Sequence, residues 1–191
     1  MEINKWMGLT FLSIFLTGCI PAVFVAGGAA GAALSSDNRN LQTISDDTDT
    51  THQANNLIQN DEALSKEAHI TVTLFNGNAL ITGQAPNTDL QQRPEQLIKS
   101  LKKIHKIFNQ VKIAEPIGAF TRSNDALITT NVKTRMLTTT DLKSSQFKII
   151  TEDGTVYIMG LATKEQARMA VNVASQSTGV KQVVKLIEYV S

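Results

Sequence analysis

Apolar and polar residues alternate in two short stretches of the chain, and each stretch predicts a β-hairpin. Residues 69–85 (HITVTLFNGNALITGQA) and 147–162 (FKIITEDGTVYIMGLA) both show this alternation, which is the period of a strand with one buried face. Asn76-Gly77 and Asp153-Gly154 interrupt the two runs. Both dipeptides favour a type I′ turn, because that turn needs positive φ at its two central residues.

The two hairpins belong to one repeated unit. Gly77 and Gly154 are 77 positions apart (154 − 77), and Gly83 and Gly160 keep the same spacing (160 − 83). We expect the second strands to cover 79–83 and 155–160. Gly83 and Gly160 would end them, at a point where a side chain would obstruct the exit of the chain into a helix.

Helical patterns flank both hairpins. After the second hairpin, Thr163 and Gln166 form a capping-box pattern ahead of a stripe of small apolar residues. In the first copy Pro94 falls inside the corresponding stripe and predicts a kinked, less regular helix. Before the second hairpin, Ser123-Asn124-Asp125 offers N-caps for a helix that runs to about Leu137.

A closing apolar run completes each copy, at 107–113 and 182–190. The predicted order is therefore helix–strand–strand–helix–strand, an α+β fold with a small three-stranded mixed sheet packed on two helices. We divide the chain into a leader (1–18), a tether and linker (19–45), a first domain (46–115) and a second domain (116–191). The linker is polar from residue 35 onward.

The N-terminus has the pattern of an export signal. Lys5 precedes an apolar run over 6–16, which is too short to cross a bilayer. The run ends in Leu16-Thr17-Gly18-Cys19, which resembles the lipobox of lipoprotein signal peptides. The resemblance implies cleavage before Cys19, which would carry a diacylglycerol and an N-acyl chain. Ile20, in place of an aspartate, implies export to the outer membrane. The alternative is a short N-terminal helix with Cys19 as a buried free thiol.

The composition of the chain argues against several classes of function. Net charge is +1 and aromatic residues make up 5% of the chain, which argues against a nucleic-acid partner. The one cysteine cannot form an intramolecular disulfide, and the three histidines lie far apart. Nucleophile–base motifs and phosphate-binding loops are missing from the sequence. We therefore expect no enzyme activity, no small-molecule substrate, no metal, and no cofactor apart from the acyl groups on Cys19.

The repeated unit resembles the BON domain, and a lipobox followed by two such units resembles the dual-BON outer-membrane lipoproteins. The most specific stretches include residues 67–73, Gly83-Gln84-Ala85-Pro86-Asn87, Ser123-Asn124-Asp125 and Met159-Gly160-Leu161. The resemblance implies two tandem BON domains, attachment to phospholipid surfaces and a role in outer-membrane integrity. The family has no assigned catalytic residues, so none are transferred to this chain.

The helix over 124–137 carries the candidate binding face. Its stripe of Ile128, Val132 and Met136 suits a core, while another face presents a set that could contact an anionic bilayer. That set is Leu127, Thr130, Lys133, Thr134 and Leu137. Family members have a tryptophan where this chain has Leu127, and leucine lacks the preference of an aromatic side chain for the interface. The alternative is that Leu127 and Leu137 pack against the other domain.

Two charged clusters are weaker candidates. Lys99, Lys102, Lys103, His105 and Lys106 could attract phosphate headgroups, but we interpret them as a solvated helix face. Asp46, Asp47 and Asp49 lack the glycine and terminal glutamate of an EF-hand loop, so we interpret them as a solvated linker.

Two functional hypotheses remain. The first is a lipoprotein that binds anionic phospholipid through its second domain. The second is a protein-interaction adaptor for outer-membrane protein assembly or cell-division machinery.

Overall fold

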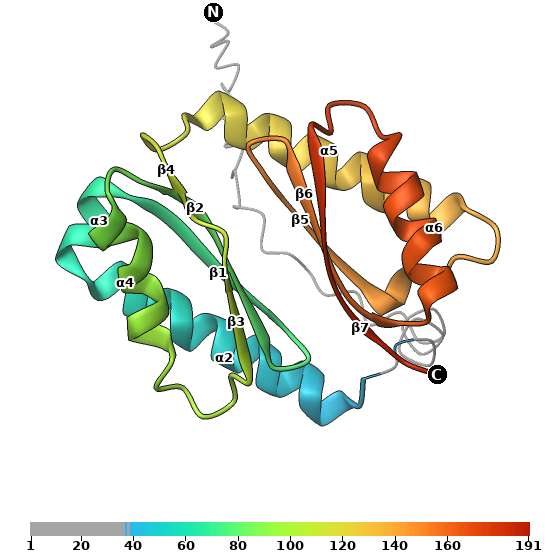
Figure 1. Cartoon of the computed structure of the whole chain (residues 1–191), viewed down its shortest axis with the longest axis horizontal. Helices are drawn as coiled ribbons and strands as arrows, with labels where there is room; N and C mark the ends of the chain where they lie inside the picture. Colours follow the sequence, from blue (N-terminus) through green and yellow to red (C-terminus); the bar gives the residue numbers. More distant parts are fainter. Residues whose placement is uncertain (1–36, 38) are drawn as a thin grey trace, which may run out of the picture.

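The computed structural model describes Asp37 and residues 39–191. Two α/β units follow one another along the chain, with their sheets facing each other and their helices on the outside (Figure 1). Residues 1–18 and Cys19 lie outside the described residues. No described helix is long and apolar enough to cross a membrane.

The elements confirm the predicted α+β fold. The first unit comprises α2 (Leu41–Asn60), α3 (Glu62–Glu67), β1 (His69–Phe75), β2 (Asn78–Ala85), α4 (Thr88–Ile98), β3 (Lys106–Asn109) and β4 (Lys112–Ile113). The second comprises α5 (Ala119–Thr138), the 3-10 turn η1 (Ser144–Gln146), β5 (Phe147–Glu152), β6 (Thr155–Ala162), α6 (Lys164–Ser175) and β7 (Gln182–Tyr189).

Both sheets are mixed. β1 pairs with β2 and β5 with β6 in antiparallel fashion, whereas the closing strands pair in parallel with β2 and β6. β3 and β4 keep one offset of 28 positions against β2 (106 − 78 and 112 − 84), so they are one strand interrupted at residues 110–111. The first copy is the less regular one, as predicted, but the irregularity lies in its closing strand, whereas α4 is a continuous helix with Pro94 inside it.

The hairpin turns form where the sequence placed them. Asn76 and Gly77 have φ of 52° and 70°, and Asp153 and Gly154 have 48° and 70°. Positive φ at both central residues identifies type I′ turns.

The prediction for Gly83 and Gly160 was wrong in its mechanism, because both glycines lie inside strands that continue to Ala85 and Ala162. A Cβ on Gly83 would lie 1.7 Å from the His69 carbonyl oxygen, and Gly83 has φ of 129°. A Cβ on Gly160 would lie 2.7 Å from the Phe147 ring. The neighbouring strand, rather than the exit into a helix, therefore excludes a side chain.

The observed first residues of α2 and α5 contradict two further predictions. α2 begins at Leu41, because the Asn40 side chain accepts a hydrogen bond from the Thr43 amide at 2.7 Å. The segment interpreted as linker is therefore helical from residue 41. α5 begins at Ala119 with Gly118 as its N-cap, so Ser123-Asn124-Asp125 lies inside the helix.

Hydrophobic residues form three layers. One core lies between β1–β2 and the helices α2 and α4, and a second lies between β5–β6 and the helices α5 and α6. A third cluster joins the facing sheets and is formed by Phe75, Leu80, Tyr157 and Met159. Both faces of each sheet are therefore covered, and the two units share a buried interface.

Polar side chains also cross this interface. The Gln84 amide donates to the Glu152 carboxylate at 2.7 Å in a buried position, and the Lys148 ammonium donates to the Leu74 carbonyl at 3.2 Å. Burial raises the pKa of Glu152 and lowers the pKa of Lys148. The contacts between the domains thus place ionisable groups away from water.

Candidate functional site

The helix α5 separates its side chains into a buried face and an exposed face. Ile128, Val132 and Met136 are 3%, 0% and 1% exposed, which confirms the predicted core stripe. The candidate set of Leu127, Thr130, Lys133, Thr134 and Leu137 is exposed throughout. Leu127 and Leu137 are 69% and 72% exposed. The structure therefore brings all five predicted residues together on the surface of one helix, which we call the outer face of α5.

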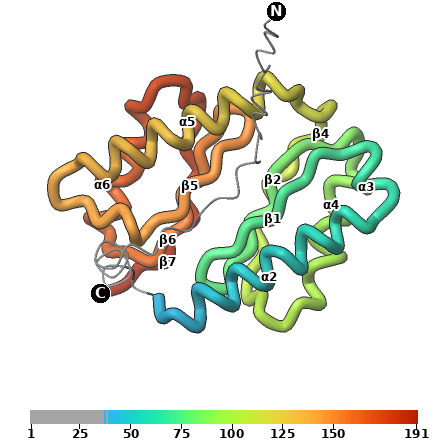
Figure 2. The backbone as a smooth tube through the Cα atoms, turned by 180° about the vertical axis from the view of Figure 1, so that it is seen from behind, coloured from blue at the N-terminus to red at the C-terminus, as the bar shows by residue number. Residues whose placement is uncertain are grey.

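The outer face does not pack on the first domain. The contact between the domains is made by the two sheets, whereas α5 covers the opposite side of its sheet (Figures 1 and 2). The alternative that Leu127 and Leu137 bury themselves against the other unit was therefore wrong.

Phe120 belongs to the same face and was missed by the sequence reasoning. It is 89% exposed and lies seven residues, or about two turns, before Leu127. The helix was expected to begin near residue 123, which placed Phe120 outside it. A start at Gly118, where the Pro116-Ile117-Gly118 segment ends, would have revealed Phe120, Leu127 and Thr134 in one line along the helix.

The ionic groups on the surface of α5 all carry positive charge. Lys133 is exposed, Arg135 is partly exposed, and Arg122 donates to the Ile117 carbonyl at 2.7 Å from an exposed position. The one acidic residue of α5, Asp125, is 5% exposed. An apolar ridge bordered by cations, with no accessible acid on the same helix, has the physical character of a surface that binds anionic lipid.

Asp125 stabilises the hairpin turn of the second domain, a role that the sequence did not predict. Its carboxylate accepts hydrogen bonds from the amides of Asp153 and Gly154 at 2.7 and 2.8 Å, which fixes the hairpin turn against α5. Asp47 of α2 does the same for Asn76 and Gly77, at 2.6 and 2.8 Å. The interpretation of Asp47 as part of a solvated linker was therefore wrong.

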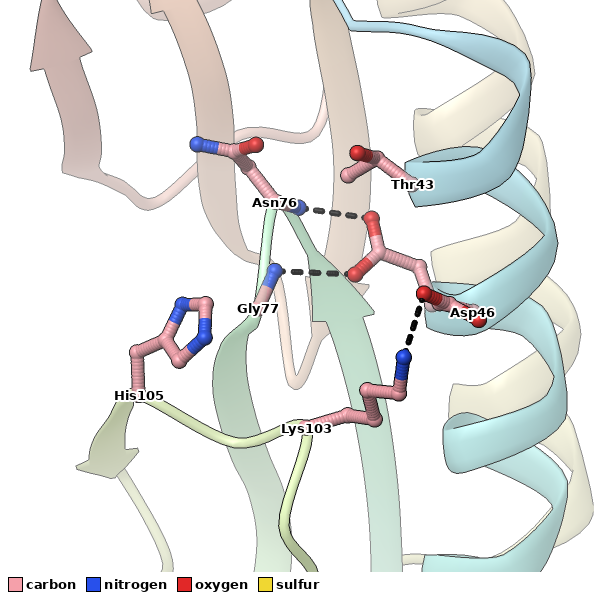
Figure 3. A pocket seen from close by; sticks show the side chains of 7 residues that line it. Thr43, Asp46, Asn76, Gly77, Lys103 and His105 are labelled. Atoms are coloured by element: carbon pink, nitrogen blue, oxygen red, sulfur yellow. Dashed lines mark hydrogen bonds and ion pairs between the residues drawn. The ribbon is translucent and has the colours of Figure 1, made fainter.

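The basic run of the first domain lies mainly beyond the helix, because α4 ends at Ile98 and Lys99 is its C-cap. Lys103 forms an ion pair with Asp46 at 2.8 Å. The two line a hollow of about 300 Å³ beside the turn, together with Thr43, Asp47, Asn76, Gly77 and His105 (Figure 3).

The charges in this hollow are largely compensated. Asp47 also pairs with Arg39 at 2.8 Å, and Asp46 with Lys103. Among the described residues no group of three or more histidine, cysteine or acidic side chains could hold a metal ion. The ion pair with Asp46 therefore compensates the charge of Lys103, the one lysine of the run that lines the hollow.

Comparison with known proteins agrees with the repeated architecture. A family model described as the BON domain matches residues 46–115 and 124–191. The chain is 32% identical over 177 residues to "Outer membrane lipoprotein DolP" of Haemophilus influenzae, covering 93% of this chain and 91% of that protein. It is 33% identical over 154 residues to "21 kDa hemolysin" of Actinobacillus pleuropneumoniae, covering 81% and 79%.

Among solved structures, the C-terminal domain of CdsD, a structural protein of the type III secretion system of Chlamydia trachomatis, is 10% identical. The match covers 75% of this chain and 98% of that one, with a TM-score of 0.31. This likeness is too weak to bear on function.

Proposed function

Since the chain belongs to the family of dual-BON lipoproteins that includes DolP, we propose that it is a non-enzymatic outer-membrane lipoprotein that binds anionic phospholipid through α5. The acyl chains on Cys19 would hold the protein at the membrane, facing the periplasm. The second domain would then bind the lipid surface and support envelope integrity.

The observation that carries the proposal is the outer face of α5. Three large apolar side chains, Phe120, Leu127 and Leu137, are between 69% and 89% exposed on one helix. Exposed apolar residues scattered singly are ordinary, but a row of them beside lysine and arginine is typical of helices that lie in the membrane interface. Thr130 and Thr134 are small enough to let the helix approach the headgroups, and the hydroxyl of Thr130 is already bonded to the Ala126 carbonyl at 2.9 Å.

Energetic considerations favour weak, lipid-selective binding. Full burial of a leucine side chain contributes about 1.5–3 kcal/mol, and one lysine near an anionic surface contributes about 1 kcal/mol. Partial insertion of three apolar side chains together with Lys133 would therefore give measurable affinity for anionic vesicles. The affinity would fall at high salt, because screening weakens the lysine contribution.

Co-sedimentation of the acyl-free mature chain with anionic vesicles tests the proposal. Leu127→Glu should reduce binding about tenfold, because it removes an inserted apolar group and adds a charge that the membrane repels. Lys133→Gln should reduce binding about fivefold and weaken its salt dependence. The matched control is Leu41→Glu, since Leu41 is 67% exposed but lies on α2 of the first domain.

If Leu127→Glu and the control Leu41→Glu both lose binding, the added negative charge alone explains the loss. The proposed site on α5 would then be wrong. If the wild-type chain stays in solution at low salt, membrane contact comes from acylation alone. The adaptor hypothesis, with outer-membrane assembly or cell-division proteins as partners, would then be the better account.

A further inference from the structure

β7 is an unprotected edge of the second sheet. The strand order is β5-β6-β7, and β7 pairs in parallel with β6 over all eight of its residues. On an edge strand, alternate residues direct their N–H and C=O groups away from the sheet, which makes the edge a template for another strand. Among the described residues, no hydrogen bond from another element occupies this edge of β7.

The corresponding strand of the first domain is interrupted between β3 and β4, and residues at the interruption are bonded to α4. Gln91 of α4 donates to the Val111 carbonyl at 2.8 Å, and Asn109 donates to the Gln91 carbonyl at 2.9 Å. These bonds accompany the interruption between β3 and β4. The N-caps of α4 and α6, Asn87 and Thr163, are 76 positions apart (163 − 87), which places Ala167 in the position of Gln91. Alanine has no side-chain donor, so it cannot make the corresponding hydrogen bond. The two copies therefore differ in this respect, because the closing strand is interrupted in the first and continuous over Gln182–Tyr189 in the second.

A groove of about 240 Å³ lies beside this edge, lined by residues of β7 and α6. Its floor is apolar, because it is lined by the buried Ala167 and the partly buried Val171 and Val183. Tyr189 closes one side and is 48% exposed. A groove of this size beside a free edge can hold an apolar side chain of an added strand.

The rim of the groove is cationic. Lys164 and Lys185 are exposed and line the groove, and neither has an ion-pair partner among the described residues. The ammonium of Lys185 lies 5.6 Å from the centroid of the Tyr189 ring. The acid of β7, Glu188, is turned toward the first domain, where it accepts hydrogen bonds from the side chains of Asn76 and Asn78.

We infer that β7 and the groove beside α6 bind an extended acidic segment of a partner protein by strand addition. The backbone of the segment pairs with the outer edge of β7, one apolar side chain enters the groove, and its carboxylates meet Lys164 and Lys185. This site is separate from the outer face of α5 and does not depend on lipid binding there.

The test uses the acyl-free mature chain and NMR titration with synthetic octapeptides in which glutamate alternates with valine and phenylalanine. The acidic peptide should shift the amide signals of residues 182–189 saturably. A twin with lysine in place of glutamate should not. A twin methylated on alternate backbone nitrogens should also fail, because strand addition needs those N–H groups.

Charge-reversal variants provide the matched controls. The double variant Lys164→Glu, Lys185→Glu should weaken binding of the acidic peptide about tenfold or more. Lys99→Glu, Lys102→Glu changes the net charge equally in the first domain and should change binding less than about twofold. Circular dichroism checks that both variants fold.

Three results of the peptide titration would overturn the inference. The acidic peptide fails to shift β7, the methylated twin binds equally well, or the shifts map to another strand. Concentration-dependent self-association through β7 would instead identify a second copy of the chain as its occupant, and perturbation of β7 by anionic vesicles would identify lipid. Either of these also overturns it.

Discussion

The two buried aspartates make the most specific structural prediction. Asp47 and Asp125 each hold the hairpin turn of their own domain through two backbone amides, at 2.6–2.8 Å. Both side chains belong to residues that are 5% exposed. Asp125→Ala should therefore leave two amide donors of the turn at Asp153-Gly154 without their acceptor.

The magnitude follows from the number and kind of these bonds. A hydrogen bond to a charged group contributes about 1.5–3 kcal/mol to stability, and water that enters the space left by the side chain recovers part of the loss. We expect Asp125→Ala to lower the free energy of unfolding by about 2–4 kcal/mol, a large part of the total for an ordinary domain. Asp125→Asn should lie in between, because its amide oxygen still accepts one bond. Asp47→Ala should cost at least as much, since Asp47 also pairs with Arg39.

Urea unfolding followed by circular dichroism measures the effect, with Asp49→Ala as the matched control. Asp49 is exposed and lies two residues from Asp47 on the same helix. A loss below about 0.5 kcal/mol in both Asp47→Ala and Asp125→Ala, equal to that of the control, would refute the role assigned to the aspartates.

Two other predictions concern Gly83, which lies against the neighbouring strand, and the buried carboxyl group of Glu152. Gly83→Ala should destabilise the first domain by about 3 kcal/mol or more, because its Cβ would meet the His69 carbonyl oxygen at 1.7 Å. Gly118→Ala, where the added Cβ meets nothing within 4 Å, should unfold in urea much like wild type, and equal losses in the two would argue against the clash. Because burial raises the folded-state pKa of Glu152, its stabilising contribution is complete below the unfolded pKa of about 4.3 and is lost as pH rises through the folded pKa. Glu152→Gln keeps an acceptor for Gln84. The unfolding free energy of the wild type minus that of the variant should therefore decline as pH rises above the unfolded pKa, and a difference that does not change with pH would contradict the assignment.

Local signals in the sequence predicted the parts of the fold that depend on neighbouring residues. Asn76-Gly77 and Asp153-Gly154 specify their turns through their own backbone preferences. Thr163 caps α6 as expected, accepting from the Gln166 amide at 3.3 Å. The Gln166 side chain, by contrast, accepts from the Lys143 amide at 2.8 Å, a loop contact that the capping-box pattern does not contain.

Contacts between distant parts of the chain could not be predicted in the same way. Asp47 and its turn are about 30 positions apart, and Gln84 and Glu152 are 68 apart. An aspartate in a polar stretch has the same composition whether it faces water or a turn, so Asp47 could be assigned only from the folded structure. The polar pairs between the facing sheets had no local pattern for the same reason.

The candidate face was predicted more completely than the interface between the domains. Leu127, Lys133 and Leu137 follow the helical period, which is visible in the sequence. Phe120 was missed because the position of the first turn depends on Gly118, which caps without a side-chain bond. The exposure of the face depended on which side of the sheet meets the other domain, and only the structure determines that.

Paramagnetic broadening by nitroxide-labelled lipid tests the central claim most directly. The acyl-free mature chain is placed with anionic nanodiscs carrying a headgroup nitroxide, and amide signals are compared before and after reduction of the label. We predict that broadening is strongest along α5, from Phe120 through Leu137, and is absent with zwitterionic nanodiscs. Uniform broadening, or broadening centred on the first domain while α5 stays sharp, would contradict the proposal that this helix binds the membrane.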